Sequence, residues 1–484
     1  MNKMNIKTKQ ILIPSILIVL ISIISNIFHY TIHIEDAIKL EPLSEYGIAI
    51  SIWRILFEPI IGILLFFNRA LYSIDELMYT LVWVLLAFLI YSIYKSIIAK
   101  ENKSKFIIAQ VVNAPLILGL WFTLFVVIAF IPLPNNTIVN NSAESVLVNT
   151  HSHSEFSHDG LITQQGLWEW HKRNGFDAFF ITEHNNHNRT LDFVQAQRNN
   201  EFQIEPLVMC GEEFSGSNHL SLLGLKRKFS TRGYADSTTI DSVRANNGAV
   251  IVNHWFDGKH KSLGYYKNIG VDGFEIINSA TERVYNRDLY KEMKEYCKNN
   301  NLIMNGGVDF HGYGNACSIW NSFEIPNWDI LDPDRKEEAI LNIIRSRDQS
   351  KMKVLFYKDR PYYDSTDLLY SPIFTLFNYF RTLNFYQLIS WIIWISIFTA
   401  IKTYRDSRFN ERLSANKLLS IGSLLSGLFM ILLGLSYYMR IENVIGFTEM
   451  YEEYSTILFY VGFALLIYSS ITIYFRNKAI GFKK

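Results

Sequence analysis

Apolar residues gather in the two outer parts of the chain, on either side of a more polar central region. Six of the apolar runs approach or exceed the roughly 20 residues that cross a bilayer as a helix. They lie at 11–29, 79–98 and 107–131 before the central region, and at 384–401, 418–438 and 455–475 after it. No small-residue cleavage site follows the first run, so we expect an uncleaved anchor rather than a signal peptide. The pattern predicts a multi-pass cell-membrane protein with membrane regions at 1–133 and 371–484 and a domain at 134–370.

A further stretch, residues 47–72, is apolar enough to span a membrane but contains Arg54, Glu58 and Pro59. Ionisable groups are costly at the bilayer centre unless they pair or face a protected cavity. Arg54 and Glu58 are four positions apart and could pair on one helical face. The segment is therefore either a re-entrant or interfacial helix, which we favour, or a full span with a functional ion pair.

The charged segments between the runs predict an orientation. Basic residues precede the first run, fill 95–105 and 402–417, and close the chain at 476–484, whereas 35–45 and 442–453 are acidic. Short basic segments stay in the cytoplasm. Six spans place every basic segment inside, both acidic segments outside, and the central domain outside as well. A seventh span at 47–72 would break this agreement.

Short apolar runs alternate with helical patterns through the central domain. The runs include 145–149, 178–181, 206–210, 250–252 and 302–304, most of them next to a polar residue, and helical patterns lie at 163–173 and 288–298. Alternation of strands and helices over this length predicts an α/β fold with a parallel sheet and, with this many strands, a barrel. The active site of such a barrel lies at the carboxyl ends of its strands.

Ten of the 12 histidines fall between positions 151 and 311, most of them where a predicted strand ends. Several carboxylates, among them Glu213 and Asp309, share these strand ends. Imidazole and carboxylate together are the ligands that Zn²⁺, Mn²⁺ and Fe²⁺ prefer. The sequence therefore predicts a multinuclear metal centre.

Composition excludes some other chemistries. A formal net charge of +1 over 484 residues gives no reason to expect a nucleic-acid partner. The three cysteines have no CxxC spacing and predict neither a disulfide framework nor a thiolate metal site, so we expect buried, inert thiols. No Gly-x-Ser-x-Gly or Cys/His arrangement supplies a nucleophile.

Seven motifs at these strand ends resemble, in order, those of the PHP (polymerase and histidinol phosphatase) superfamily. They read VNTHSHSEFSHDG, ITEHNNH, GEEFS, HLSLLGL, VNHW, FEIINS and GVDFHG, and they cover about residues 145–311. The resemblance implies a distorted (β/α)7 barrel with two or three divalent metal ions (Zn, Mn or Fe). It also implies hydrolysis of phosphoesters.

The resemblance further implies which positions hold metal. The first ion would be held by His151, His153, Glu213 and Asp309. The second would share Glu213, which matches the family's bridging carboxylate, and add His219 and His254. The third would be held by His184 and His311 with a ligand from the turn at 157–160, where His158 and Asp159 are both candidates.

Residues near these ligands are expected to orient them. Glu183 stands where the family usually has Asp, and with Asn185 and Asn253 it is a candidate to hydrogen-bond the ligands. Trp255 follows His254 where Pro is common, which changes the wall of the site more than its metal.

Four other residues receive ordinary interpretations. His171 is expected on the surface of a helix, His187 in a solvated loop, and Glu275 in a structural role. His260 lies between two lysines, in a charged loop or against a substrate phosphate.

Ions held this way would lower the pKa of a bridging water toward about 7 and supply hydroxide at neutral pH. We therefore expect a membrane-anchored phosphoesterase acting on a phosphate mono- or diester outside the cell. The substrate could be a phosphorylated lipid or a small molecule such as a nucleotide or sugar phosphate. Two alternatives stay open: a metal-dependent hydrolase of a non-phosphate bond, and a non-enzymatic membrane protein that senses metal or ligand.

Overall fold

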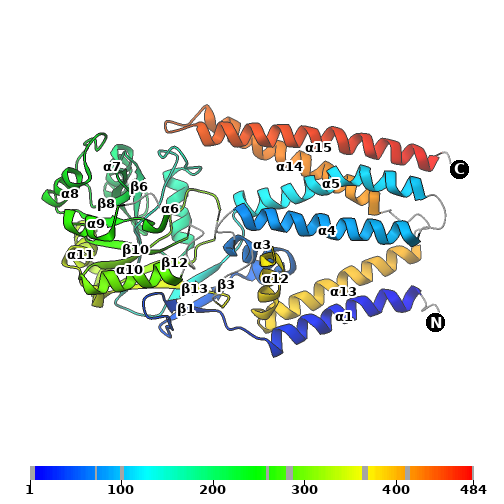
Figure 1. Ribbon diagram of the computed structural model, residues 1–484, viewed down its shortest axis with the longest axis horizontal. Helices are drawn as coiled ribbons and strands as arrows, with labels where there is room; N and C mark the ends of the chain where they lie inside the picture. The colour runs from blue at the N-terminus through cyan, green and yellow to red at the C-terminus, as the bar shows by residue number, and fades with distance from the viewer. Residues whose placement is uncertain are drawn as a thin grey trace.

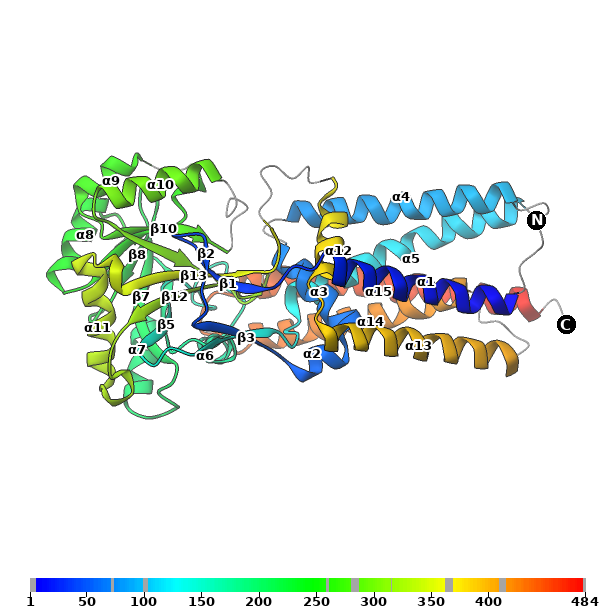
Figure 2. The ribbon, with the colours of Figure 1, turned by 90° about the horizontal axis from the view of Figure 1, so that it is seen from below.

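The computed structural model describes residues 6–70, 74–98, 103–257, 261–279, 287–314, 316–361, 369–408 and 415–481. An α/β domain lies at one end of the molecule, and a group of long helices extends from it (Figure 1). The first of these helices begins, and the last one ends, at the end farthest from the domain (Figures 1 and 2).

The domain is built on one eleven-stranded sheet in the order β11-β10-β9-β8-β7-β6-β5-β12-β13-β1-β2. Its strands in the central region are β5 (Ser145–Asn149), β6 (Ala178–His184), β7 (Leu207–Ser215), β8 (His219–Leu223), β9 (Ala249–Val252), β10 (Gly273–Asn278), β11 (Ile303–Gly307), β12 (Ile319–Glu324) and β13 (Met352–Lys358). Strands β5, β6 and β7 are parallel, as are β9, β10 and β11. The parallel prediction is wrong for β8, β12 and β13, which pair antiparallel with their neighbours. Only residues 216–218 join β7 to β8, too few for the crossover that a parallel pair needs.

The structure does not show the expected barrel as closed, because no backbone ladder joins β11 to β12 among the described residues. Strand β11, at one end of the sheet order, is nevertheless hydrogen-bonded to a side chain of β12. The amide of Asn321 accepts from Gly306 N at 2.8 Å and donates to Gly306 O at 2.7 Å. Gly306 allows this approach, because a Cβ there would lie 2.6 Å from Ile319. The α/β fold is therefore of the predicted kind, with a sheet that is not closed by backbone hydrogen bonds.

Helices cover the outside of the sheet. They are α6 (Gln164–Arg173), α7 (Asn188–Arg198), α8 (Asp236–Ala245), α9 (Leu263–Ile269), α10 (Arg287–Asn299) and α11 (Pro333–Ser346), with short 3₁₀ turns at Trp255–Asp257, Trp328–Ile330 and Gln349–Lys351. Asp332 caps α11 by accepting from Arg335 N, and proline starts the helix, where its missing N–H costs nothing. Ile340 and Ile344 of α11 then pack with Phe180 and Ile251 of the sheet in one buried cluster.

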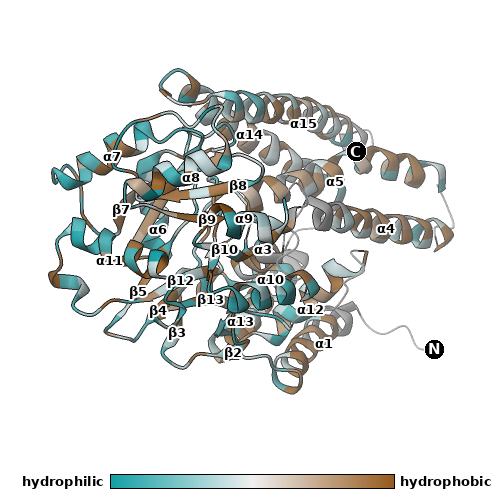
Figure 3. Ribbon diagram, turned by 60° about the vertical axis from the view of Figure 1, so that its left-hand side comes forward, coloured by the Kyte–Doolittle hydropathy of each residue, from teal (hydrophilic) through white to brown (hydrophobic). Residues whose placement is uncertain are grey.

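Six long helices form the other end of the molecule: α1 (Ile6–Ile27), α4 (Ile74–Ile98), α5 (Lys103–Phe130), α13 (Phe385–Arg408), α14 (Ala415–Ile441) and α15 (Glu449–Gly481). Five of them, all except α1, contain stretches long and apolar enough to cross a membrane. The apolar stretch identified in α1 is Leu12–Ile27, which is shorter. Hydrophobic residues run along these helices, whereas the helices around the sheet are largely hydrophilic (Figure 3). The helices suggest a membrane protein, and five of the six predicted runs coincide with them.

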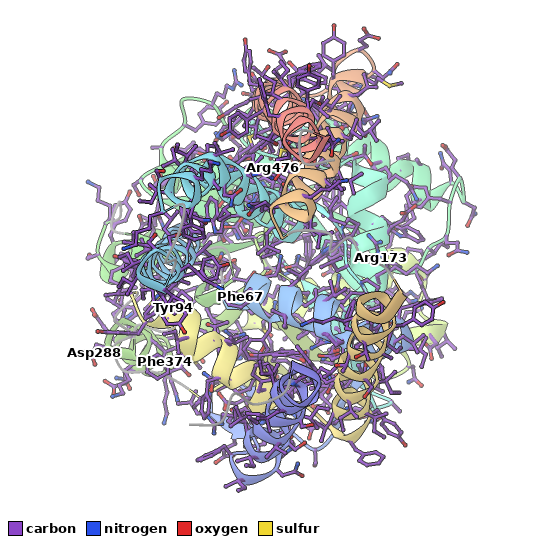
Figure 4. The ribbon with its side chains drawn as sticks, turned by 90° about the vertical axis from the view of Figure 1, so that its right-hand side faces the viewer. Phe67, Tyr94, Arg173, Asp288, Phe374 and Arg476 are labelled. Carbon is purple, nitrogen blue, oxygen red and sulfur yellow. The ribbon has the colours of Figure 1, made fainter. Side chains whose placement is uncertain are left out.

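Viewed along their length, the long helices fall into two groups (Figure 4). Helices α5, α14 and α15 contact one another, α4 packs on α5, and α1 packs on α13. Arg476, labelled in Figure 4, ties α15 to α5 by donating to Asn113 Oδ1 at 2.6 Å. Near the domain, α3 (Glu58–Ala70) and α12 (Ser371–Arg381) connect the two groups.

The segment 47–72 contains most of β3 (Tyr46–Ile50), then α2 (Ile52–Leu56) and α3. Helix α3 has 13 residues, which rise about 20 Å and fall short of the roughly 30 Å of a bilayer core. Arg54 and Glu58 do pair, with Nε and Oε2 3.4 Å apart and both side chains buried. The re-entrant or interfacial interpretation remains a prediction.

Residues between α1 and α2, which the sequence places in the N-terminal membrane region, add strands to the domain. β1 (His33–Asp36) pairs with β13, with Ile34 opposite Tyr357, and β2 (Glu41–Pro42) pairs with β1. β3 pairs with β4 (Asn136–Asn140) in a separate two-stranded sheet. These strands lie at the same end of the long helices as the α/β domain (Figure 2).

Candidate metal centre

The centre is organised around Glu213, near the end of β7. Its side chain is about 1% exposed and faces five imidazole rings. Oε1 lies 3.1 Å from His151 Nε2, 3.0 Å from His219 Nδ1 and 3.2 Å from His254 Nε2. Oε2 lies 3.2 Å from His153 Nε2 and 3.1 Å from His184 Nδ1. The two oxygens therefore face different histidines, as a carboxylate between two ions must.

Strand ends bring these rings together. His151 and His153 follow β5, His184 ends β6, His219 begins the antiparallel β8, and His254 follows β9. Carboxyl ends of parallel strands meet at one edge of a sheet, and an antiparallel strand brings its first residue to the same edge.

Asp309, two residues after β11, closes the other side of the first predicted set. Its Oδ1 lies 3.2 Å from Nε2 of both His151 and His153. The four residues predicted for the first ion thus lie together.

The third predicted set gathers around Asp159. Its Oδ2 lies 3.2 Å from Nε2 of both His184 and His311. The ring of His153 is close to both of these histidines, with centroids 4.6 Å from His184 and 4.3 Å from His311. His158 is 65% exposed, its Nε2 is 4.0 Å from Asp159, and it joins none of the ligand groups found among the described residues. The geometry favours Asp159 over His158.

Four groups of side chains offer ligand atoms within 4.8 Å of one another, and they overlap. They are His153-Asp159-His184-His311, His151-His153-Glu213, His151-His254-Asp309 and His184-Glu213-His219. Every predicted ligand except His158 belongs to one of them. The grouping differs from the predicted one, because His153 also faces Asp159, and His254 groups with His151 rather than with His219. Which residues hold which ion remains a prediction.

Metal ions fit the unsatisfied atoms of this centre. Nε2 of His153, Nδ1 of His184 and Oδ1 of Asp159 are buried without a hydrogen-bond partner among the described residues. Carboxylate oxygens nevertheless lie 3.1–3.2 Å from both nitrogens. These nitrogen and oxygen lone pairs point toward one another with no hydrogen bond between them. In a buried site such an arrangement is unfavourable unless a cation lies between the atoms.

Without a cation, protons would carry the missing positive charge. Burial lowers the pKa of His153, but the contacts of His153 with Asp309 and Glu213 outweigh this effect and raise the pKa to about 9. For the Glu213 carboxyl, burial raises the pKa, but His151 and the other histidines outweigh burial and hold this pKa well below its usual range. In the metal-free centre, the His153 imidazolium thus faces the Glu213 carboxylate.

We therefore expect metal binding to release protons and to tighten as pH rises. His153 is protonated at pH 7 in the metal-free protein and must lose its proton to bind a metal. Because its folded pKa is raised above 6.5, its protonation stabilises the metal-free fold fully below that pH. This stabilisation is lost as pH rises toward 9. Calorimetric titration with Mn²⁺ in buffers of different ionisation enthalpy measures the released protons, and binding without proton release would contradict this account.

Of the predicted orienting residues, Asn253 bonds a ligand directly and Glu183 acts through a serine. Asn253 Nδ2 donates to Glu213 Oε1 at 2.8 Å. Glu183 accepts from Ser157 Oγ at 2.7 Å, and Ser157 Oγ in turn lies 3.0 Å from His153 Nδ1. Asn185 does neither: its side chain bonds Ser215, and only its backbone N reaches Glu213 O, at 3.0 Å.

Glu275, given a structural role from sequence, is a direct partner of His151. Its Oε1 lies 2.8 Å from His151 Nδ1, and its Oε2 accepts from His254 N at 3.1 Å and Asn278 Nδ2 at 2.9 Å. A carboxylate on the second ring nitrogen fixes the orientation of a metal-binding histidine. Gly307 makes room for it, since a Cβ there would lie 2.0 Å from Glu275 Oε1.

Substitution Glu275→Gln is therefore expected to weaken metal binding about 10- to 100-fold. The carboxylate of Glu275 accepts from His151 Nδ1 with one oxygen and from His254 N with the other. The glutamine side chain has only one oxygen and no charge, so it cannot accept both hydrogen bonds. Equilibrium dialysis against buffered Mn²⁺ measures the change, and unaltered affinity would leave Glu275 with the structural role alone.

Two histidines outside the centre are buried, contrary to the predictions. His171 accepts through Nε2 from Asn149 at 2.9 Å, and Asn149 also donates to His151 O at 3.0 Å. Burial lowers the pKa of His171 to about 3, so it is neutral. His187 is not solvated either, because it pairs with Glu212 through Nδ1 and contacts Arg227 O through Nε2 at 2.8 Å. His260 lies outside the described residues.

All three cysteines are buried thiols outside any disulfide, as predicted. Burial raises the pKa of Cys297 to about 12 and that of Cys210 well above its usual value, so neither is a reactive thiol at neutral pH.

Comparison with known proteins places the motifs in a family. Residues 149–300 match the family model of the PHP domain. No curated protein matches the chain. Similar solved structures include a two-domain protein containing a predicted PHP-like metal-dependent phosphoesterase from Bacteroides vulgatus, PsfC from Pseudomonas syringae, and an amidohydrolase from Chromobacterium violaceum with bound sulfate and no metal.

These likenesses are distant. The Bacteroides structure is 18% identical over 44% of this chain and 65% of its own, with a TM-score of 0.34. The Pseudomonas structure is 15% identical over 42% of this chain and 98% of its own, with a TM-score of 0.30. The Chromobacterium structure is 13% identical over 44% and 98%, with a TM-score of 0.29. The family match and the geometry of the centre together lead to one conclusion: residues 149–300 of this chain form a PHP domain.

Proposed function

We propose that the chain is a membrane-anchored, metal-dependent phosphoesterase that hydrolyses a phosphate mono- or diester. The observation that carries this proposal is the placement of Glu213, whose two oxygens face two sets of histidines. The PHP match supports a metal-dependent hydrolase. When bound, two or three divalent ions would lower the pKa of water and neutralise charge that develops on phosphoryl oxygens.

The residues of the chain divide the remaining work. The proposed ligands are His151, His153, Asp159, His184, Glu213, His219, His254, Asp309 and His311. Glu275 keeps His151 Nε2 directed at the centre by accepting at Nδ1, and Asp309 O does the same for His311 at 2.9 Å. Asp159, 30% exposed, and His219, 37% exposed, form the open side, where a substrate phosphate would enter.

A phosphorylated lipid and a soluble phosphate are both candidate substrates. A cavity of about 480 Å³ favours the lipid. It lies between the ends of α3 and α5 and the loop after His311, and Ile131, Trp170, Phe310 and Tyr313 are among its lining residues. An apolar chain bound there would leave its phosphate near the centre.

A substrate panel tests the proposed reaction on the full chain in detergent or nanodiscs loaded with Mn²⁺ or Zn²⁺. The panel contains p-nitrophenyl phosphate, bis-p-nitrophenyl phosphate, a short-chain phospholipid and a p-nitroanilide. We expect hydrolysis of at least one phosphoester and not of the anilide. Hydrolysis of the anilide alone would favour the non-phosphate alternative, and full metal occupancy without any hydrolysis would favour the sensor.

We also propose that the PHP domain lies outside the cytoplasm. The basic segments support this, because the end of α4, the start of α5, the end of α13 and the start of α14 all lie at the end of the helices remote from the domain, as do the start of α1 and the end of α15 (Figures 1 and 2). Single cysteines at two exposed positions test it, because the native cysteines are buried. Glu201→Cys should react with an impermeant maleimide in intact cells, and Lys103→Cys, at the start of α5, only after lysis; the reverse result would invert the orientation.

A further inference from the structure

We infer that the helices of the two membrane regions position one particular metal group of the PHP domain. This is the group formed by His153, Asp159, His184 and His311. Two of its members, His153 and His184, are set by strand ends, whereas Asp159 and His311 stand in loops. Membrane-region helices hold both loops: α14 and α15 bond the first, and α3 and α5 bond the second, which also has an aromatic contact with α15. The inference rests on metal binding at this group and not on phosphoester hydrolysis.

The loop that carries Asp159 is held by α14 and α15 through Glu155. Arg440, one residue before the end of α14, forms a bidentate ion pair with this carboxylate. Its Nη2 lies 2.6 Å from Oε1 and its Nε 3.1 Å from Oε2. Tyr451 of α15 adds a hydrogen bond to Oε2 at 3.2 Å. Glu155 is only 5% exposed, and a two-pronged Arg–carboxylate pair fixes orientation as well as distance. Glu155 stands four residues before Asp159, so its position limits where Asp159 can lie.

The turn between α14 and α15 also grips the backbone of this loop. Phe447 N donates to Glu155 O at 2.8 Å. Gly446 lies so close that a Cβ there would be 2.3 Å from the same carbonyl oxygen. Helix α15 has 33 residues and is about 50 Å long, which exceeds a bilayer core by roughly 20 Å. The extra length lets the α14–α15 hairpin reach beyond α4 and α5 toward the domain (Figure 1).

The loop after His311 is held by α3 and α5. Asn68 of α3 donates to Gly314 O at 2.7 Å and to Ile128 O at 2.6 Å, and it accepts from Ala316 N. Gly314 N donates in turn to Ala129 O at 3.0 Å. The Asn68 side chain is therefore a buried link between the end of α5 and the residues that follow the metal ligand.

Aromatic contacts join the two sides. The ring of Tyr313, two residues after His311, lies 6.3 Å from the ring of that histidine. It also lies 6.1 Å from Phe130 of α5 and 6.2 Å from Tyr454 of α15. Glycines on either side of Tyr313 adopt φ near +90°, so the loop itself offers little local rigidity. Helix contacts supply the order that this ligand needs.

The experiment measures binding of each Mn²⁺ ion to the full chain in nanodiscs, by titration and by metal content at fixed free Mn²⁺. Arg440→Ala and Asn68→Ala are each expected to weaken one ion about tenfold and to leave the others within about twofold. Arg440 and Asn68 are positioning residues, so neither variant should change the number of tightly held ions at Glu213. In an Asp159→Asn background, Arg440→Ala should have no further effect, because both substitutions act on the same ion.

Arg244→Ala is the matched control. Arg244 also binds a buried carboxylate, Asp272, at 3.3 Å and has a similar exposure to Arg440, but it lies on α8, away from the centre. Equal Mn²⁺ binding in Arg440→Ala, Asn68→Ala and Arg244→Ala would overturn the inference, and so would uniform weakening of every ion. If Arg440→Ala does not fold, Arg440→Lys tests the same point, since lysine keeps the charge but not the two-pronged pair. Its expected weakening is about threefold.

Discussion

The substitution Glu213→Gln is expected to remove most bound metal and to lower hydrolysis on the order of a thousandfold. The Glu213 carboxylate lies within 3.2 Å of five histidines. A neutral amide keeps the volume but presents only one oxygen and no charge, so it cannot serve two ions. Metal ions contribute several kcal/mol to such reactions, and about 4 kcal/mol corresponds to a factor of a thousand. Metal content and the hydrolysis rate of the best phosphoester in the panel measure the effect.

Glu212 supplies the matched control for this experiment. It precedes Glu213 on β7 and is equally buried, but successive strand residues point to opposite faces. Glu212 binds His187 and Thr231 instead of the centre. Glu212→Gln should therefore lower stability and keep the metal. If both variants keep the same metal content, Glu213 is not a ligand.

The second large effect concerns the turn at 157–160. Asp159→Asn is expected to weaken binding of the ion held with His184 and His311 by about a hundredfold or more. This loss is larger than the one expected when a residue that only orients a ligand is replaced. The reason is that Asp159 Oδ2 is the carboxylate oxygen 3.2 Å from both rings. His158→Ala should change the same binding by no more than about 0.5 kcal/mol, as at ordinary surface positions. Mn²⁺ titration of the two variants compares them directly, and a larger loss in His158→Ala would reassign the ligand.

Much of the centre could be predicted because its ligands follow a simple rule. His151, His184 and His254 each stand at or just beyond the end of a buried apolar strand, where chain order alone reveals their common edge. The partner of His151 could not be found this way. Glu275 lies 124 positions away in the middle of β10, and only the folded sheet brings them together. The grip of Arg440 on Glu155, across 285 positions, likewise left no local signal.

The sequence contains patterns that indicate the buried position of His171 and the antiparallel direction of β8, both of which were predicted wrongly. His171 stands four residues after Leu167 on the apolar side of α6, which indicates a buried position, and its Nδ1 lies 2.8 Å from Leu167 O. Ser215-Gly216-Ser217-Asn218 between two apolar runs is typical of a hairpin turn, so β8 could have been predicted antiparallel. By contrast, β1 has only four residues, and its pairing with β13 depends on tertiary contacts.

Removal and return of metal test the central claim most directly. The full chain is stripped by a chelator, dialysed, and titrated with Mn²⁺ while bound metal and phosphoester hydrolysis are measured in the same samples. We expect no hydrolysis in the stripped protein and a return of activity that follows occupancy up to two or three ions per chain. Hydrolysis that persists after the metal has been removed would contradict the assignment of this centre as the catalytic site.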